Sequence, residues 1–133
     1  MKLSTRYGAV GIAALAALTA VQWLRENGYA EGDLPGYLLG VLPNLFAALA
    51  ITFVVLSFFS DQRKLTNSRN ATPWFLLAAT ISGAGLTGWE YIQRTSGRFV
   101  FDLHDIAATI VGLALSVVFF LLVTPRAENL PPT

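Results

Sequence analysis

The sequence has no cysteine and few charged residues, and both absences narrow the class of protein. Without cysteine, the chain can form neither a disulfide nor a thiol-based catalytic or metal site. Charged residues make up 13% of the chain, whereas an ordinary soluble domain has about a quarter. A formal net charge of +1 is too small to indicate a nucleic-acid-binding protein. What remains is a chain of 133 residues, 54% of them hydrophobic, that is short enough to be one domain.

The few charges are clustered between four apolar runs that contain no charged residue. The runs are Tyr7 to Leu24, Tyr37 to Phe59, Pro73 to Trp89, and Ile106 to Val123. A helix needs about 20 residues to cross a bilayer core, and the runs lack the alternation of barrel strands. The sequence therefore predicts an all-α integral membrane bundle of four transmembrane helices. The bundle is expected to form a single membrane domain over residues 1–133, with helices at about 7–24, 37–59, 73–92 and 104–123.

The first run could also be a cleaved signal peptide, because Lys2 and Arg6 precede an alanine-rich stretch. A cleavage site ending at Ala20 needs a small residue two positions earlier, where the chain has Leu18. The run also continues to Leu24, beyond the usual signal core. We therefore expect this segment to be retained as the first helix.

Basic residues in short loops predict the orientation of the helices. Six basic residues belong to the N-terminus, the second connection and the C-terminal tail: Lys2, Arg6, Arg63, Lys64, Arg69 and Arg126. Only three, Arg25, Arg94 and Arg98, belong to the other two connections. Both termini are therefore predicted to be cytoplasmic, with the first and third connections on the outer face.

Small residues recur at helical spacing in the apolar runs. The sets are Ala108, Gly112 and Ser116; Ala79 and Gly83; Ala84 and Gly88; and Gly8 and Gly11. Helices in lipid associate through such residues, so the sets predict tight packing within the chain. A cofactor groove or a dimer interface is the alternative interpretation of these glycines.

Pro43 interrupts the second run and leaves two alternatives. One is a kinked helix from Tyr37 to Phe59, because proline removes a backbone hydrogen bond. The other is a short surface segment through Leu42, with Pro43 opening the spanning helix. In either case Asn44 is predicted near the outer leaflet, where its amide needs a polar partner.

The stretch WEYIQRTSGRFVFDLHD, Trp89 to Asp105, concentrates charge in one connection. If the third helix continues through its first residues, Glu90, Gln93 and Arg94 project from one side. Asp102 is a candidate N-cap of the fourth helix, with Asp105 at the third helical position, where a carboxylate favours the helix dipole.

Glu90 lies at the end of a spanning run, where a carboxylate is costly unless it is paired or solvated. Arg98 is its predicted partner, because a guanidinium binds a carboxylate through two bonds. The two residues form either a structural ion pair or part of a functional site, and the sequence leaves both open. A metal site at His104 is not favoured, because the neighbouring aspartates do not share a helical face with it and there is no second histidine.

The spacing of these residues resembles the motif of VanZ-like membrane proteins. That motif reads E-x-x-Q, then R, then D-x-x-D, then a small-residue helix with glycine. In this chain its residues are Glu90, Gln93, Arg98, Asp102, Asp105 and Gly112. The family commonly has asparagine four residues after the last aspartate, where this chain has Thr109, so its ligand can differ from that of its relatives. The resemblance implies a motif at the membrane surface, in a family whose founding member is linked to low-level teicoplanin resistance.

These observations lead to one expected function and two main alternatives, and a small transporter or proton path ranks below them because the helix centres have no ionisable residue. We expect a multi-pass protein of the bacterial inner membrane whose outer face binds an envelope lipid head group or a cell-wall precursor. The candidate ligand-binding residues are Glu90, Gln93, Arg98, Asp102, Asp105 and Asn44. One alternative is a membrane-embedded enzyme that uses Glu90 and Asp105 on a lipid-linked substrate; the other is a purely structural bundle. No metal, cofactor or nucleic acid is expected, and a homo-oligomer is left open.

Overall fold

The computed structural model describes residues 2–29, 32–95 and 103–127, together with their side chains except those of residues 93–95. Four helices occupy these ranges: α1 (Leu3–Glu26), α2 (Asp33–Arg63), α3 (Ser68–Thr95) and α4 (Leu103–Val123). The all-α prediction is confirmed. Most helices extend a few residues beyond the predicted bounds, because the backbone continues its hydrogen bonding into the polar flanks of each apolar run.

Three of the helices in the described ranges, α1, α2 and α4, are long and apolar enough to cross a membrane. The chain is thus a helical bundle with the character of a multi-pass membrane protein. The remaining helix, α3, is also long, but its middle has glycines at 83, 85 and 88 between hydroxyl-bearing residues. These small and polar residues lower its apolar character, so length and composition alone do not identify it as a span.

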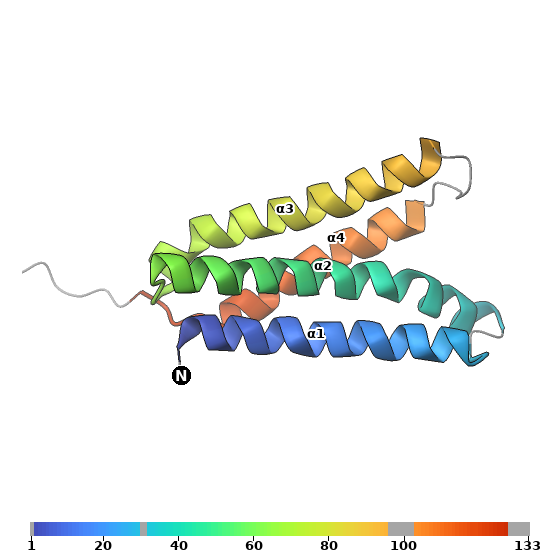
Figure 1. Ribbon diagram of the computed structural model, residues 1–133, viewed down its shortest axis with the longest axis horizontal. Helices are drawn as coiled ribbons and strands as arrows, with labels where there is room; N and C mark the ends of the chain where they lie inside the picture. The colour runs from blue at the N-terminus through green and yellow to red at the C-terminus, as the bar shows by residue number, and fades with distance from the viewer. Residues whose placement is uncertain (1, 30–31, 96–102, 128–133) are drawn as a thin grey trace, which may run out of the picture.

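Helix α2 lies at the centre of the bundle and contacts each of the other three helices. The start of α1, the α2–α3 connection and the end of α4 lie together at one end, which we call the termini end (Figure 1). The end of α1, the start of α2, the end of α3 and the start of α4 lie at the opposite, far end (Figure 1). The three segments predicted to share one side of the membrane therefore do share one end of the bundle.

Helix α2 is continuous through Pro43. Proline lacks the N–H that would bond the carbonyl of Leu39, which weakens the helix at this point. The N-terminal part of α2 bends toward the end of α1 (Figure 1). The prediction of one helix through Pro43 is therefore confirmed, and the alternative of a separate surface segment ending at Leu42 is wrong.

Three helices meet at Ala48 in the middle of α2. Gly112 of α4 packs directly on this turn, since a Cβ at position 112 would collide with the carbonyl oxygen of Leu45 and lie 2.9 Å from the Cβ of Ala48. From α3, the hydroxyl of Ser82 donates a hydrogen bond of 2.9 Å to the Ala48 carbonyl. The Thr52 hydroxyl donates to the same carbonyl over 2.7 Å. We call this the Ala48 crossing; it fixes α3 and α4 against one turn of α2.

An aromatic core fills the bundle nearer the termini end. The fully buried Tyr7 has its ring centroid 5.9 Å from that of Phe53 and 6.2 Å from that of Phe120. Phe120 in turn stacks on Phe75 at 4.4 Å. The Tyr7 hydroxyl forms a 2.7 Å hydrogen bond with that of Thr124, so the buried phenol is satisfied. This core joins all four helices.

Most of the predicted small-residue sets pack within the chain. Ala108, Gly112 and Ser116 are buried, and Gly11 approaches the backbone of Val54 on α2. The exception is the pair Ala84 and Gly88, which is exposed, with nothing within 4 Å of a Cβ at Gly88. For that pair the prediction of intrachain packing is wrong, because both residues lie on the face of α3 that turns away from α2.

Replacing Gly112 with alanine tests the Ala48 crossing. The added methyl group has no space against the Leu45 carbonyl, so α4 must shift, and overpacking of this kind typically costs about 1–3 kcal/mol. We expect a clear fall in the thermal stability of purified Gly112→Ala in mild detergent. Gly85→Ala is the matched control, because nothing lies within 4 Å of its Cβ and alanine is the better helix former. Equal stability of the two variants would contradict the close approach.

Candidate functional site

Glu90 lies on the inward-facing stripe of α3. The buried residues of that helix are Ala71, Phe75, Ala78, Ser82 and Glu90, and they follow one another at intervals of three, four or eight. Residues at such intervals share one face of an α-helix. Ser82 on this stripe bonds to α2, so the stripe faces the bundle. Glu90, with 7% of its side chain exposed, is therefore directed inward rather than toward lipid.

The Ala48 crossing also sets the level of Glu90 relative to α4. Ser82 and Gly112 both contact Ala48, and Glu90 follows Ser82 by eight residues, which is about 12 Å along the helix toward the far end. Asp105 precedes Gly112 by seven residues, which is about 10 Å in the same direction because α4 runs antiparallel to α3. The two carboxylates thus lie at nearly the same height near the far end.

Asn44 and Thr109 occupy the next level below these carboxylates. Asn44 precedes Ala48 by one helical turn, so it shares the face of α2 that meets α3 and α4. Thr109 is buried, and its hydroxyl donates a 3.0 Å hydrogen bond to the backbone carbonyl of Asp105. Polar residues therefore continue inward from the far end to the Ala48 crossing. We call Asn44, Glu90, Asp105 and Thr109 the far-end column.

A contact between α2 and α4 closes one side of the far end. The Tyr37 hydroxyl and the Nδ1 atom of His104 form a hydrogen bond of 3.1 Å. Their rings also meet edge to face, with centroids 5.3 Å apart. The two residues are separated by 67 positions in the chain, so the contact holds the start of α4 against the start of α2 next to Asp105.

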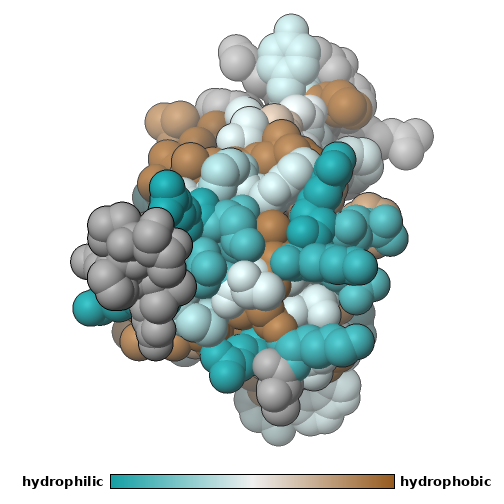
Figure 2. Space-filling model, turned by 90° about the vertical axis from the view of Figure 1, so that its left-hand side faces the viewer, coloured by the Kyte–Doolittle hydropathy of each residue, from teal (hydrophilic) through white to brown (hydrophobic). Residues whose placement is uncertain are grey.

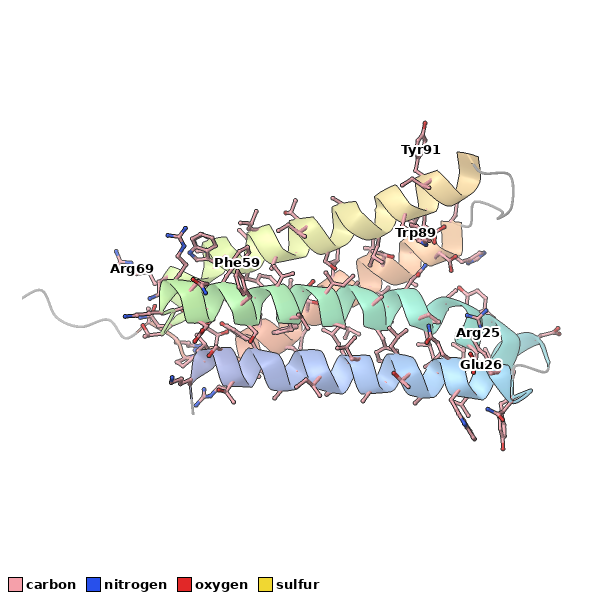
Figure 3. The ribbon with its side chains drawn as sticks, viewed as in Figure 1. Arg25, Glu26, Phe59, Arg69, Trp89 and Tyr91 are labelled. Carbon is pink, nitrogen blue, oxygen red and sulfur yellow. The ribbon has the colours of Figure 1, made fainter. Side chains whose placement is uncertain are left out.

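Exposed aromatic side chains lie at the same end of the bundle as the column. Trp89, the neighbour of Glu90, is 57% exposed, and Trp23 at the end of α1 is 55% exposed. Trp89 and Tyr91 lie on the last turns of α3, at the same end as Arg25 and Glu26 of α1 (Figure 3). Tryptophan and tyrosine concentrate where hydrocarbon gives way to head groups, and the end of the bundle that contains Glu90 has this composition.

The structure brings together only part of the predicted site. Glu90, Asp105 and Asn44 share the far end, and Asp105 is the third residue of α4, as predicted. The helical backbone of α3 extends through Gln93, whose side chain is not described. Arg98 and Asp102 lie outside the described residues, so the predicted ion pair and N-cap stay predictions.

The column combines two carboxylates, which accept hydrogen bonds when ionised, with an amide and a hydroxyl that can also donate. No hydrogen bond or ion pair joins Glu90 or Asn44 to another described residue. A carboxylate near the hydrocarbon boundary is unfavourable unless it is paired or solvated, and a partly buried amide also needs a polar partner. By contrast, the hydroxyls of Thr52, Ser82 and Thr109 are all satisfied by backbone carbonyls. Near the far end, Glu90 and Asn44 thus have hydrogen-bonding capacity that no described residue uses.

Comparison with known proteins gives no further guide, since no protein-family model, curated protein or solved structure matches this chain. The resemblance to VanZ-like proteins therefore rests on the motif residues alone.

Sequence reasoning missed Tyr37 and the interaction of His104. The sequence marks His104 only as a possible metal ligand and Tyr37 only as the start of an apolar run. Their contact joins two segments far apart in the chain, which no local spacing reveals. What the sequence does show is a tyrosine and a histidine near the starts of two helices, α2 and α4, that are expected to run parallel.

Replacing Glu90 with glutamine separates a structural from a functional role. If the carboxylate is buried without a partner, the neutral amide leaves the thermal stability of the detergent-purified protein unchanged or raises it. Glu26→Gln, an exposed carboxylate at the same end, is the control and should have no effect. A loss of about 3–5 kcal/mol in Glu90→Gln alone would instead identify a buried ion pair that holds the helices together.

Proposed function

We propose that this chain is a VanZ-like protein of the bacterial inner membrane that binds the polar head group of an envelope lipid or of a lipid-linked cell-wall precursor. The far-end column is the binding site. The observation that carries the proposal is the position of Glu90, a carboxylate turned into the bundle at head-group depth with no partner among the described residues. An ionisable side chain that faces the inside of a bundle at this depth is typical of residues that bind ligands in membranes.

In this proposal all four helices cross the bilayer. The outer face of α3 supports its inclusion, because Leu76, Leu77 and Ile81 are exposed in the middle of the helix, although apolar. At 28 residues α3 is about 42 Å long, which exceeds the hydrocarbon thickness of about 30 Å. A soluble bundle would have polar residues at these positions.

The orientation follows from the charges at the two ends. The termini end has the six basic residues of the flanking segments, so it is the cytoplasmic end, and the far-end column then faces outward. A membrane-impermeant thiol reagent should accordingly reach Tyr29→Cys, but not Arg126→Cys, in intact cells.

The column suits head groups that donate hydrogen bonds. Carboxylates and the amide oxygen of Asn44 accept bonds from hydroxyl or ammonium groups, such as those of a sugar, glycerol or ethanolamine. Arg98, if it returns to this end as its place in the chain predicts, would bind the adjacent phosphate through its planar guanidinium. Together these groups match the two parts of a phosphorylated head group.

An enzyme remains the second candidate, and the similar height of Glu90 and Asp105 favours it. Two carboxyls at one level can serve as an acid and a base when their surroundings differ. Loss of turnover of a lipid-linked substrate in Glu90→Gln, with lipid binding retained, would support catalysis over binding.

Lipid retention by the purified protein tests the proposed function. The full chain is placed in phosphatidylcholine nanodiscs that contain small amounts of phosphatidylethanolamine, phosphatidylglycerol or a polyprenyl phosphate, and retained lipid is measured by native mass spectrometry. We expect selective retention of at least one of these probes and about a tenfold loss of affinity in Glu90→Gln, the typical effect of removing a charged hydrogen-bond partner.

One control and one further test variant make this result specific. Glu26→Gln removes an exposed carboxylate at the same end and should retain lipid as the wild type does. Arg98→Ala tests the predicted phosphate contact. Wild-type retention by folded Glu90→Gln and folded Arg98→Ala would overturn the proposal.

A further inference from the structure

A second polar cavity lies at the termini end, opposite the far-end column. Its volume is about 480 Å³, within the range of cavities that bind small molecules. It is enclosed by the start of α1, the end of α2 and the segment that follows α4. Hydrophilic side chains surround this end of the molecule (Figure 2). Its chemistry differs from that of the far end, where carboxylates predominate.

Cations outnumber anions in the cavity lining. Lys2, Arg6 and Lys64 contribute three positive charges, and Asp61 contributes one negative charge. Arg6 is held in place, because its Nη1 atom donates a 3.2 Å hydrogen bond to the backbone carbonyl of Val123 at the end of α4. The cluster therefore has a fixed guanidinium together with two lysines, and it is electropositive.

The start of α1 adds to this positive potential. Lys2 is the N-cap, no side chain caps the helix, and no acidic residue occupies its first turn. Leu3 and Ser4, whose N–H groups precede the first helical hydrogen bonds, line the cavity. Uncapped N–H groups and the positive end of the helix dipole favour an anion.

Ser60 provides an independent indication of a ligand. Its side chain is 3% exposed, and its hydroxyl is the buried side-chain polar atom that has no hydrogen-bond partner among the described residues. Buried hydroxyls are normally satisfied, as Thr52 and Ser82 are in this bundle. Ser60 lines the cavity, so a ligand there can supply the missing acceptor.

Lys64 has a backbone conformation that is unusual for lysine. It ends α2 with φ at 51°, in the left-handed region. Glycine or asparagine is usual at this position of a helix, because the Cβ of other residues is strained there. Strained residues concentrate at functional sites, and the charge of Lys64 is one of the three that line the cavity.

We infer that this cavity binds a phosphate group. Arg6, Lys2 and Lys64 would balance its charge, Ser60 would donate a hydrogen bond, and the start of α1 would supply N–H donors. A phosphate can come from the head group of an acidic phospholipid or from a soluble phosphate ester. The position of the cavity suits a head group, because Trp74 marks the interface at the same end. The Trp74 ring lies tilted against that of Phe59, with centroids 5.0 Å apart, and under the guanidinium of Arg63 at 4.8 Å.

The inference is tested with two probes on the purified full chain. One is phosphatidylglycerol in phosphatidylcholine nanodiscs, measured by native mass spectrometry. The other is soluble glycerol phosphate, measured by thermal stabilisation in neutral detergent. Lys64→Asn removes the charge but suits the left-handed backbone, so the variant should fold at least as well as the wild type. We expect it to lower phosphate affinity about tenfold.

Ser60→Ala should separate binding from stability. Removing an unpartnered buried hydroxyl leaves the ligand-free protein as stable as the wild type or more stable, while phosphate affinity falls about threefold. Arg69→Gln is the charge-matched control, an exposed cation at the same end that does not line the cavity. It should bind phosphate as the wild type does.

The outcomes distinguish the source of the phosphate. Loss of phosphatidylglycerol retention in Lys64→Asn and Ser60→Ala, with little effect of glycerol phosphate on the wild type, supports a lipid head group. Stabilisation by glycerol phosphate that both variants lose supports a soluble ester. Equal effects of Lys64→Asn and Arg69→Gln, or no binding of either probe, would overturn the inference. Because these variants lie at the end opposite Glu90, the result is independent of the proposed function.

Discussion

The contact of Gly112 with the backbone of α2 at Leu45 and Ala48 is the constraint on which the arrangement of this bundle depends. In lipid there is little hydrophobic gain from bringing apolar helices together, so close backbone approach and buried hydrogen bonds determine the register. Gly112 permits that approach for α4. The Ser82 hydroxyl, bound to the Ala48 carbonyl, fixes α3 against the same turn. Both helices are thus positioned by one point on α2.

This crossing point connects packing to the candidate site. Once Ser82 and Gly112 are fixed, helical rise places Glu90 and Asp105 at similar heights near the far end, above Asn44 and Thr109. The far-end column therefore results from the register of the helices and not from proximity in the chain. The opposite end has the inverse character, with cations gathered around the start of α1. A membrane protein with unlike ends can interact differently with the two leaflets, by accepting hydrogen bonds at one and attracting phosphate at the other.

The helices could be predicted well from the sequence, because the absence of charge over about 17 to 25 residues has few explanations. The continuity of α2 through Pro43 could not be predicted, because proline permits either a kink within a helix or the start of one. The inward direction of Glu90 was also undecided, because the third run has small residues around much of its circumference. Its direction became clear only from the buried positions of Phe75 and Ser82.

Some residues that the sequence marks only as indicators of membrane orientation line a cavity in the fold. Lys2, Arg6 and Lys64 are such residues, and all three line the cavity at the termini end. Ser60, which follows an apolar run, could not be identified as a site residue, because a sequence does not show whether a hydroxyl has a hydrogen-bond partner. Such sites depend on contacts between segments more than fifty residues apart, so local spacing does not predict them.

The most direct test of the account measures the register of α3 against α4 near the far end. The chain has no cysteine, so paired cysteines can be introduced at Glu90 and Asp105 and treated with a short bis-maleimide in native membranes. We expect efficient intramolecular cross-linking of this pair. We expect none for cysteines at Glu90 and Leu122, which helical rise separates by about 27 Å. Failure of the first pair, or equal cross-linking of both, would contradict the register on which the proposed site depends.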